Sequence, residues 1–241
     1  MANHPLFPRP LLFGHRGDPS VATENTLEAF AACIESGIDG VELDVQLCKS
    51  GELVIFHDAT LKRMADLPLA IADVTLDELQ EIELIGGGRI PTLDSLFRLA
   101  KTELLYDLEI KVSTAKETGT SAALLALIKE HHLESSVCVS SFNPIEVRRF
   151  RRLAKNAIPT ALIYSETPDL PKIFHHGWGR HIARPTFLKP ERSQALKAQE
   201  RGFTVLTWTV DGYQEAEALL KAGVSGIISN RPVDLLPLFT G

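Results

Sequence analysis

The chain has 241 residues, of which 44% are hydrophobic and 23% charged, a balance typical of a well-packed globular protein. Its formal net charge of -6 disfavours nucleic acid and anionic membranes as partners, because long-range electrostatics would repel both. No segment approaches the roughly eighteen uninterrupted apolar residues of a membrane span, and the stretch before His15 has no signal-peptide core. The cysteines, Cys33, Cys48 and Cys138, lack a paired spacing and are typical of reduced thiols. We therefore expect a cytoplasmic protein with no stable membrane association and no nucleic-acid partner.

Short β-branched or Leu-rich runs alternate with helical patterns along the whole chain. This alternation is typical of parallel strands joined by right-handed helical crossovers. In chain order, the parallel strands are predicted at residues 11–14, 40–45, 104–111, 137–140, 160–163, 181–183, 204–208 and 226–229. The main helices are predicted at residues 25–36, 93–100, 118–131, 144–153, 169–175, 190–200 and 214–221.

Local signals refine three of these connections. Asn25 and Glu28 match a capping box, so we expect the first helix to begin at Asn25. Ser50 and Gly51 are suited to turn the chain back into a short hairpin strand at residues 53–56. A less regular stretch at about residues 59–89 is predicted to be a small insertion after the second strand.

Eight parallel strands and one hairpin strand within this length match a closed (β/α)₈ barrel, or TIM barrel. We therefore predict that residues 1–241 form a single barrel domain that carries the insertion at about residues 59–89. In such a barrel, helices cover the outer face of each strand and side chains fill the interior. Neither face of a strand is then ordinary solvent-facing surface.

Two of the predicted strands carry acids on alternate residues. Glu42 and Asp44 share one face, about 7 Å apart along the strand, and Asp107 and Glu109 repeat the pattern. A sheet with one solvated face would explain this equally well in an antiparallel protein, but not in a barrel. Buried carboxylates without compensation cost many kcal/mol, so they must be paired, protonated or bound to a cation.

The active sites of such barrels lie at the carboxyl ends of the strands. His15, Asp44, His57 and Lys111 all fall at such ends, which predicts an active site built around the acids. Asp107 lies one step deeper than Glu109, so we expect it to pair with a neighbouring cation. Trp208, at another strand end, is equally suited to line the pocket or to pack in the core.

The chain resembles the glycerophosphodiester phosphodiesterase family, and most closely its short bacterial cytoplasmic type. The matching segments occur in order over almost the whole chain: Gly14-His15-Arg16-Gly17, Glu24-Asn25-Thr26, Glu42-Leu43-Asp44, His57-Asp58, Glu109-Ile110-Lys111, Trp208-Thr209-Val210 and Gly226-Ile227-Ile228. The resemblance implies a (β/α)₈ barrel with a small insertion after the second strand. It further implies cleavage of a glycerophosphodiester, a small-molecule substrate, to glycerol 3-phosphate and an alcohol with the help of Mg²⁺ or Ca²⁺.

The same resemblance implies roles for individual residues. It implies His15 and His57 as the acid/base pair, Arg16 and Lys111 as phosphate contacts, and Glu42, Asp44 and Glu109 as metal ligands. From its place at a strand end, we also predict that Trp208 binds substrate. Three carboxylates, one divalent ion and two basic side chains carry a net charge of about +1, which suits a monoanionic phosphodiester. Oxygen ligands alone favour a hard cation over zinc. These features do not choose between Mg²⁺ and Ca²⁺, assign the acid and the base, or predict an oligomeric state.

Four places depart from the family pattern. Thr23 replaces a usual proline, Asp211 a common asparagine, and Ser229-Asn230 a frequent Thr-Asp, while Ala183-Arg184-Pro185 lacks the usual asparagine before proline. None of these residues is expected to bind metal or carry a proton. Two alternative functions stay open: removal of headgroups from lysophospholipids at the same site, and non-catalytic binding of phosphorylated glycerol compounds.

Overall fold

Eight parallel strands and one antiparallel strand form a single sheet in the computed structural model, which describes residues 6, 8–112, 116, 118–166 and 172–240. The strands are β1 (Leu11–His15), β2 (Gly40–Leu47), β3 (Leu53–Ile55), β4 (Leu105–Ile110), β5 (Val137–Ser141), β6 (Thr160–Tyr164), β7 (Phe187–Pro190), β8 (Leu206–Thr207) and β9 (Gly226–Ser229). Their order is β7-β6-β5-β4-β2-β1-β9-β8, with β3 paired to β2.

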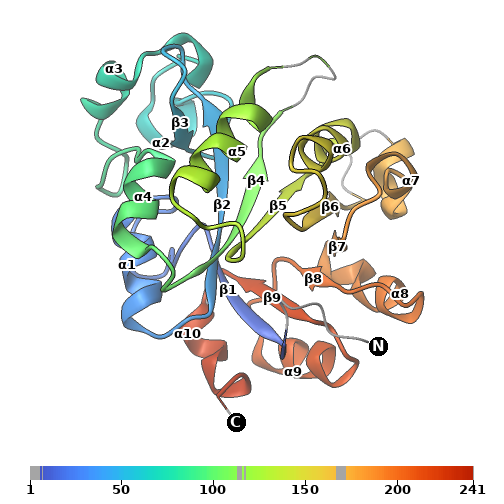
Figure 1. Cartoon of the computed structure of the whole chain (residues 1–241). Coiled ribbons are helices and arrows are strands. Elements are labelled where there is room, and N and C mark those ends of the chain that lie inside the picture. Colours follow the sequence, from blue (N-terminus) through green and yellow to red (C-terminus); the bar gives the residue numbers. More distant parts are fainter. Residues whose placement is uncertain (1–5, 7, 113–115, 117, 167–171, 241) are drawn as a thin grey trace.

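The two ends of this order meet, so the sheet is a nearly closed barrel. Parallel bridges join β7 and β8 from Leu188 to Val205 and from Glu191 to Trp208. Helices lie between successive strands and surround them on the outside (Figure 1). The predicted (β/α)₈ fold is therefore confirmed.

The described helices follow the strands in the expected alternation. The α-helices are α1 (Leu27–Glu35), α2 (Lys62–Ala65), α3 (Leu76–Gln80), α4 (Leu93–Ala100), α5 (Thr120–Glu130), α6 (Pro144–Leu153), α7 (Arg180–Ala183), α8 (Ala195–Glu200), α9 (Tyr213–Lys221) and α10 (Pro232–Leu235). The 3₁₀ turns are η1 (Ile71–Asp73), η2 (Lys172–Gly177), η3 (Arg192–Gln194) and η4 (Leu236–Leu238). No helix in the described part of the chain combines the length and the apolar character that crossing a membrane requires.

The predicted start of the first helix is wrong. Helix α1 begins at Leu27, and Thr26 is the N-cap, whose side chain accepts a hydrogen bond from the Ala29 amide. Asn25 instead has a positive φ of 59° and donates its side-chain amide to Asp44. The Asn25 side chain binds a buried acid and therefore does not cap the helix, although its local sequence predicts that it would.

The predicted strand at residues 181–183 is also wrong, because these residues end helix α7. The real strand is β7, which follows Pro185 and carries Lys189. Of the helix predicted at residues 169–175, the part at 169–171 lies outside the described residues, and the remainder lies in the 3₁₀ turn η2. The helix predicted from residue 190 begins only at Ala195, because Pro190 still belongs to β7.

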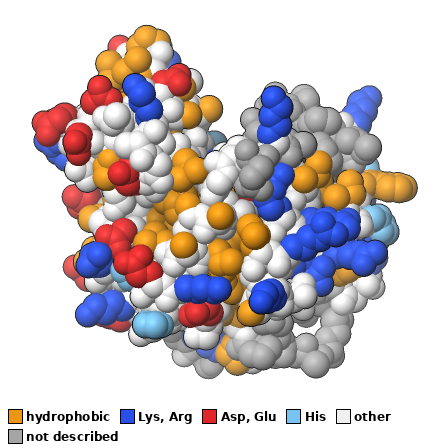
Figure 2. All heavy atoms as spheres, turned by 45° about the horizontal axis from the view of Figure 1, so that its top comes forward, with side chains coloured by type: hydrophobic (Ala, Val, Ile, Leu, Met, Phe, Trp, Pro, Cys, Tyr) orange, Lys and Arg blue, Asp and Glu red, His pale blue; other side chains and the backbone are white. Residues whose placement is uncertain are grey.

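The segment after β3 forms a small lobe with its own core. Strand β3 pairs antiparallel with β2, as the hairpin signal predicts, and α2, η1 and α3 follow it. Buried apolar residues hold the lobe together: Cys48, Val54, Phe56, Leu61, Ile71, Val74, Leu79, Leu84 and Ile90. The lobe lies at the upper left of Figure 1 and projects from the molecule at the upper left of Figure 2.

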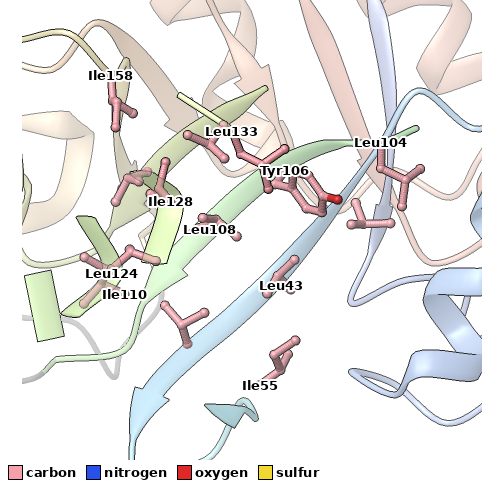
Figure 3. Packing of buried hydrophobic residues seen from close by; sticks show 14 of the residues in the cluster. Leu43, Ile55, Leu104, Tyr106, Leu108, Ile110, Leu124, Ile128, Leu133 and Ile158 are labelled. Carbon is pink, nitrogen blue, oxygen red and sulfur yellow. The ribbon is translucent and has the colours of Figure 1, made fainter. Parts of the chain in front are cut away.

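The main core lies between the strands and the surrounding helices. Leu108 and Ile110 on β4 lie beside Leu124 and Ile128 of α5 (Figure 3), and Leu43 on β2 belongs to the same outer cluster. A second apolar cluster fills the barrel interior and includes Leu11, Phe13, Cys138, Ala161, Phe187, Leu206 and Ile228. Because side chains alternate along each strand, the outward position of Leu43 sends Glu42 and Asp44 into the barrel.

Candidate active site

Strand register brings the alternating acids of β2 and β4 together. In the parallel ladder Glu42 lies beside Asp107, and Asp44 lies beside Glu109. In-register residues of neighbouring strands point to the same side of the sheet. All four carboxylates are buried, with Asp107 fully excluded from solvent. The sheet therefore concentrates four acids at one end of the barrel interior.

Three of these acids form a group with metal-ligand spacing. Carboxylate oxygens of Glu42, Asp44 and Glu109 all lie within 4.8 Å of one another. One oxygen of Glu42, Oε2, is buried without a hydrogen-bond partner among the described residues. Because a buried unpaired carboxylate oxygen is costly, this atom is suited to accept a cation. The cluster has the ligand atoms and the spacing of a metal site.

The fourth acid, Asp107, pairs with a cation that the sequence analysis missed. Lys189 on β7 is only 2% exposed, and its ammonium nitrogen lies 2.7 Å from Asp107 Oδ2 and 3.2 Å from Glu42 Oε1. Burial alone would lower the pKa of Lys189, but Asp107 and Glu42 outweigh it and raise the pKa above its usual value. Ser140 donates its hydroxyl to the other oxygen of Asp107 at 2.7 Å. The expected partner of Asp107 thus exists, on a strand that the sequence analysis misplaced.

Lys111 and Arg16 lie at the outer side of the cluster. The Lys111 ammonium is 2.7 Å from Glu109 and 3.5 Å from Asp44, and the Arg16 Nε is 3.4 Å from Asp44. Burial would raise the pKa of Asp44, but Lys111, Arg16 and His57 and a hydrogen bond from Asn25 lower it to about 2. Asp44 is therefore ionised at neutral pH, even though it is almost completely buried.

His15, the last residue of β1, contacts the cluster through one ring nitrogen. Its Nε2 lies 3.8 Å from the unpartnered Oε2 of Glu42, and its Nδ1 lies 2.6 Å from the side-chain oxygen of Asn230. The side chain of His15 is 17% exposed, so one edge of the ring is accessible. This arrangement places an imidazole beside the acids.

His57 follows β3 and belongs to a chain of ion pairs. Its Nδ1 lies 2.6 Å from Asp58, whose other oxygen accepts a hydrogen bond from Arg63. Arg63 also contacts Glu24, which in turn contacts Arg16 at 2.8 Å. We call the set Asp58, Arg63, Glu24 and Arg16 the ion-pair chain. It connects the insertion lobe to the loop after β1.

Trp208 is partly buried and packs against the interior cluster. Its indole nitrogen donates a hydrogen bond to the backbone oxygen of Lys189 at 3.0 Å, and its ring meets Phe142 edge to face at 5.7 Å. Trp208 therefore braces β7 against β8, and its predicted contact with substrate stays a prediction.

Two of the departures from the family pattern lie next to this site. Asn230 contacts His15, and the Asp211 carboxylate accepts hydrogen bonds from both the backbone amide and the side-chain amide of Asn230. No local sequence signal indicates these contacts, because His15 and Asn230 are 215 positions apart in the chain. The Ala183-Arg184-Pro185 segment, by contrast, ends helix α7 and makes no described contact with the acids.

Comparison with known proteins decides the family. The model of the glycerophosphoryl diester phosphodiesterase family matches residues 15–234. The chain belongs to this family. A glycerophosphodiester phosphodiesterase of Caldanaerobacter subterraneus subsp. tengcongensis is 34% identical over 238 residues, covering 95% of this chain and 97% of the relative. The chain is accordingly an enzyme of the glycerophosphodiester phosphodiesterase type.

Solved structures of the glycerophosphodiester phosphodiesterase family share the fold. A phosphodiesterase of Oleispira antarctica, solved in complex with the product sn-glycerol-3-phosphate, has a TM-score of 0.82 and 26% identity, covering 96% of this chain and 97% of its own. A glycerophosphodiester phosphodiesterase of Thermotoga maritima has a TM-score of 0.77 and 26% identity, covering 95% and 98%. The likeness extends over nearly the full length of each chain.

Lys189→Met should destabilise the metal-free protein by about 3–5 kcal/mol, because it leaves Asp107 and one oxygen of Glu42 buried without a cation. Combining it with Asp107→Asn should recover part of this loss, since the second change removes the uncompensated charge. Urea unfolding with chelator present measures both. Lys221→Met is the matched control, because Lys221 is exposed on α9 and pairs with Glu217, an interaction worth about 0–1 kcal/mol. A Lys189→Met protein as stable as the control would refute the compensating role.

Proposed function

We propose that this phosphodiesterase hydrolyses small glycerophosphodiesters to glycerol 3-phosphate and an alcohol, with a divalent cation and two histidines. The observation that carries the proposal is the buried group of Glu42, Asp44 and Glu109, whose carboxylate oxygens lie within 4.8 Å of one another. The product complex of the Oleispira antarctica phosphodiesterase, similar along the whole chain, supports the choice of product.

The residues at the site fit a hard cation. Glu42, Asp44 and Glu109 offer carboxylate oxygens, no cysteine or histidine belongs to the described ligand group, and Glu42 Oε2 has no partner among the described residues. Such oxygen ligands suit Mg²⁺ or Ca²⁺. When bound, the ion would stabilise negative charge that develops on the phosphoryl oxygens. We propose these three residues as its ligands.

The basic side chains make the site suitable for an anion. The four buried carboxylates and the three cations Lys111, Arg16 and Lys189 leave one negative charge, which a divalent ion would reverse. Lys111 and Arg16 are the two cations on the outer side, and we propose that they contact the phosphate.

The two imidazoles supply proton transfer. We propose that one of His15 and His57 removes a proton from the nucleophile while the other protonates the departing alcohol oxygen. Histidine suits both roles because its unperturbed pKa lies near 6.5. In each ring, Nδ1 makes the holding contact: His15 Nδ1 contacts Asn230, and His57 Nδ1 contacts Asp58. We propose that the other nitrogen, Nε2, acts on the substrate.

The nucleophile is proposed to be the 2-hydroxyl of the glycerol, which would give a cyclic phosphate that water then opens. Direct attack by water is the alternative. Phosphorus NMR during turnover distinguishes them, because only the first path forms a cyclic phosphate. Full-rate cleavage of a substrate that lacks the 2-hydroxyl would establish direct attack by water.

Chelation should abolish turnover of glycerophosphocholine, and added Mg²⁺ or Ca²⁺ should restore it. Glu42→Gln should weaken the affinity for the activating ion by at least about 10-fold, because an amide oxygen carries no full charge. Calorimetric titration of the metal-free protein with each ion measures this directly. Glu217→Gln, at an exposed residue of α9, is the control and should bind metal normally. Unchanged affinity in Glu42→Gln would remove Glu42 from the ligand set.

His57→Ala should lower kcat by about 10²- to 10⁴-fold, the usual worth of a positioned acid or base, with little change in the unfolding midpoint. Steady-state kinetics at saturating metal test this. His181→Ala, at an exposed residue of α7, should retain wild-type rates. A His57→Ala enzyme within a few-fold of the control would exclude a proton-transfer role.

Comparing glycerophosphocholine with lysophosphatidylcholine as substrates tests the choice of substrate class. An enzyme that accepts an acyl chain needs an apolar entrance, but Met64 and Leu67 of the insertion lobe pack against its core. We therefore expect much faster cleavage of glycerophosphocholine. Preference for the lysolipid would favour lysophospholipid headgroup removal, and the absence of turnover with either substrate under all metal conditions would favour a binding protein.

We also propose that residues 1–241 act as one catalytic domain in the cytoplasm. The antiparallel pairing of β3 with β2 and the ion-pair chain support a lobe that belongs to the barrel. Cys33, Cys48 and Cys138 are free and buried, which supports a reducing compartment.

A further inference from the structure

The contact behind His15 defines which of its ring nitrogens carries the proton. His15 ends β1 and Asn230 follows β9, and the ladder between these strands sets their neighbours Gly14 and Ser229 side by side. This register brings the Asn230 side chain to the Nδ1 edge of the ring, at 2.6 Å. The opposite nitrogen, Nε2, faces Glu42 at 3.8 Å.

Hydrogen-bond chemistry fixes the orientation of the Asn230 amide. The Asn230 side-chain nitrogen lies 2.9 Å from Asp211 Oδ2, and its backbone nitrogen lies 2.7 Å from Asp211 Oδ1. An ionised carboxylate only accepts hydrogen bonds, so both nitrogens must donate to it. Ser229 adds a third donor to the same carboxylate at 3.0 Å. Asp211 therefore holds the amide with its NH₂ group turned away from His15.

The remaining oxygen of the amide then determines the tautomer of the imidazole. An amide oxygen only accepts hydrogen bonds, so the His15 nitrogen that faces it, Nδ1, must be the donor. A neutral ring with its proton on Nδ1 has its lone pair on Nε2, the nitrogen directed at the acidic cluster. Asparagine is suited to this place because it accepts from the imidazole and donates to the carboxylate at the same time.

We propose that Asn230, oriented by Asp211, is a positioning residue that holds His15 in the Nδ1–H tautomer with Nε2 directed at the reaction centre. The proposal deepens the proposed function and rests on it, because it takes His15 as one of the two proton-transfer groups. Asn230 itself touches no reacting atom and acts through the imidazole. A purely structural tether between the ends of β1 and β9 would stabilise the fold without selecting a tautomer.

The tautomer is measured without turnover, by nitrogen NMR of the metal-free protein labelled with ¹⁵N-histidine, at a pH where the ring is neutral. We expect the His15 signal of the wild type to show the proton on Nδ1. Asp211→Asn removes the carboxylate that fixes the orientation of the Asn230 amide, and Asn230→Ala removes the oxygen that accepts from His15 Nδ1. Both variants should therefore show an increased share of the Nε2–H form. Circular dichroism establishes that each variant is folded, and Asp211→Asn keeps the test available if Asn230→Ala does not fold.

Kinetics with glycerophosphocholine supply the second readout. Asn230→Ala and Asp211→Asn should lower kcat by about 10-fold or more while KM changes little, a smaller loss than removal of a proton-transfer group causes. The double variant Asp211→Asn with Asn230→Asp exchanges the two side chains. The carboxylate at position 230 would accept from His15 Nδ1 and the amide at position 211 would donate to it, so the double variant should regain most of the rate. Arg231→Ala is the matched control, because the Arg231 side chain is exposed and contacts Asp234. It should leave both the tautomer and the rate unchanged.

An Nε2–H signal in the wild type would overturn the proposal. Unchanged tautomer and unchanged kcat in folded Asn230→Ala and Asp211→Asn would overturn it as well. Failure of the proposed function gives a different result: no turnover by the wild-type enzyme with either cation, but an Nδ1–H signal that the two variants lose. In that case the control of His15 by Asn230 is upheld while its catalytic use is lost.

Discussion

Burial of four carboxylates at one end of a barrel is the constraint that organises this molecule. Glu42, Asp44, Asp107 and Glu109 enter the interior because alternate residues of β2 and β4 pack outward against helices. Left alone, such a group of charges would unfold the domain or take up protons. Three basic side chains make it tolerable, and each comes from a different strand or strand end. The need to compensate these charges thus ties β1, β4 and β7 to the chemistry of β2.

The four negative charges are compensated in two places, one deep in the barrel interior and one toward its outer end. Lys189 saturates the deep part, since its ammonium group contacts both Asp107 and Glu42 Oε1. The outer part keeps the unpartnered Oε2 of Glu42, with Asp44 and Glu109 beside it. The outer carboxylates are therefore the ones left available to an exogenous cation, while Lys189 occupies the inner one.

Periodic features of the sequence predicted the fold and the acids, because strand alternation and parallel register act over short distances. Local patterns do not predict contacts between residues that are far apart in the chain and meet only when the barrel closes. Lys189 lies on a four-residue strand that shows no alternation and ends in proline, so the strand was placed at residues 181–183 instead. Asn25 was predicted as a helix cap, but its amide binds Asp44. Asn230 reaches His15 only because β9 closes the sheet beside β1.

The ion-pair chain links the insertion lobe to a basic side chain at the acidic cluster. Arg63 of the insertion lobe lies between Asp58 and Glu24, and Glu24 also steadies Arg16 beside the acids. A foreign lobe grafted onto this scaffold without an equivalent arginine would leave two carboxylates facing each other and would loosen Arg16. A substitution at Arg63, outside the acidic cluster, would therefore change how Arg16 is held within it.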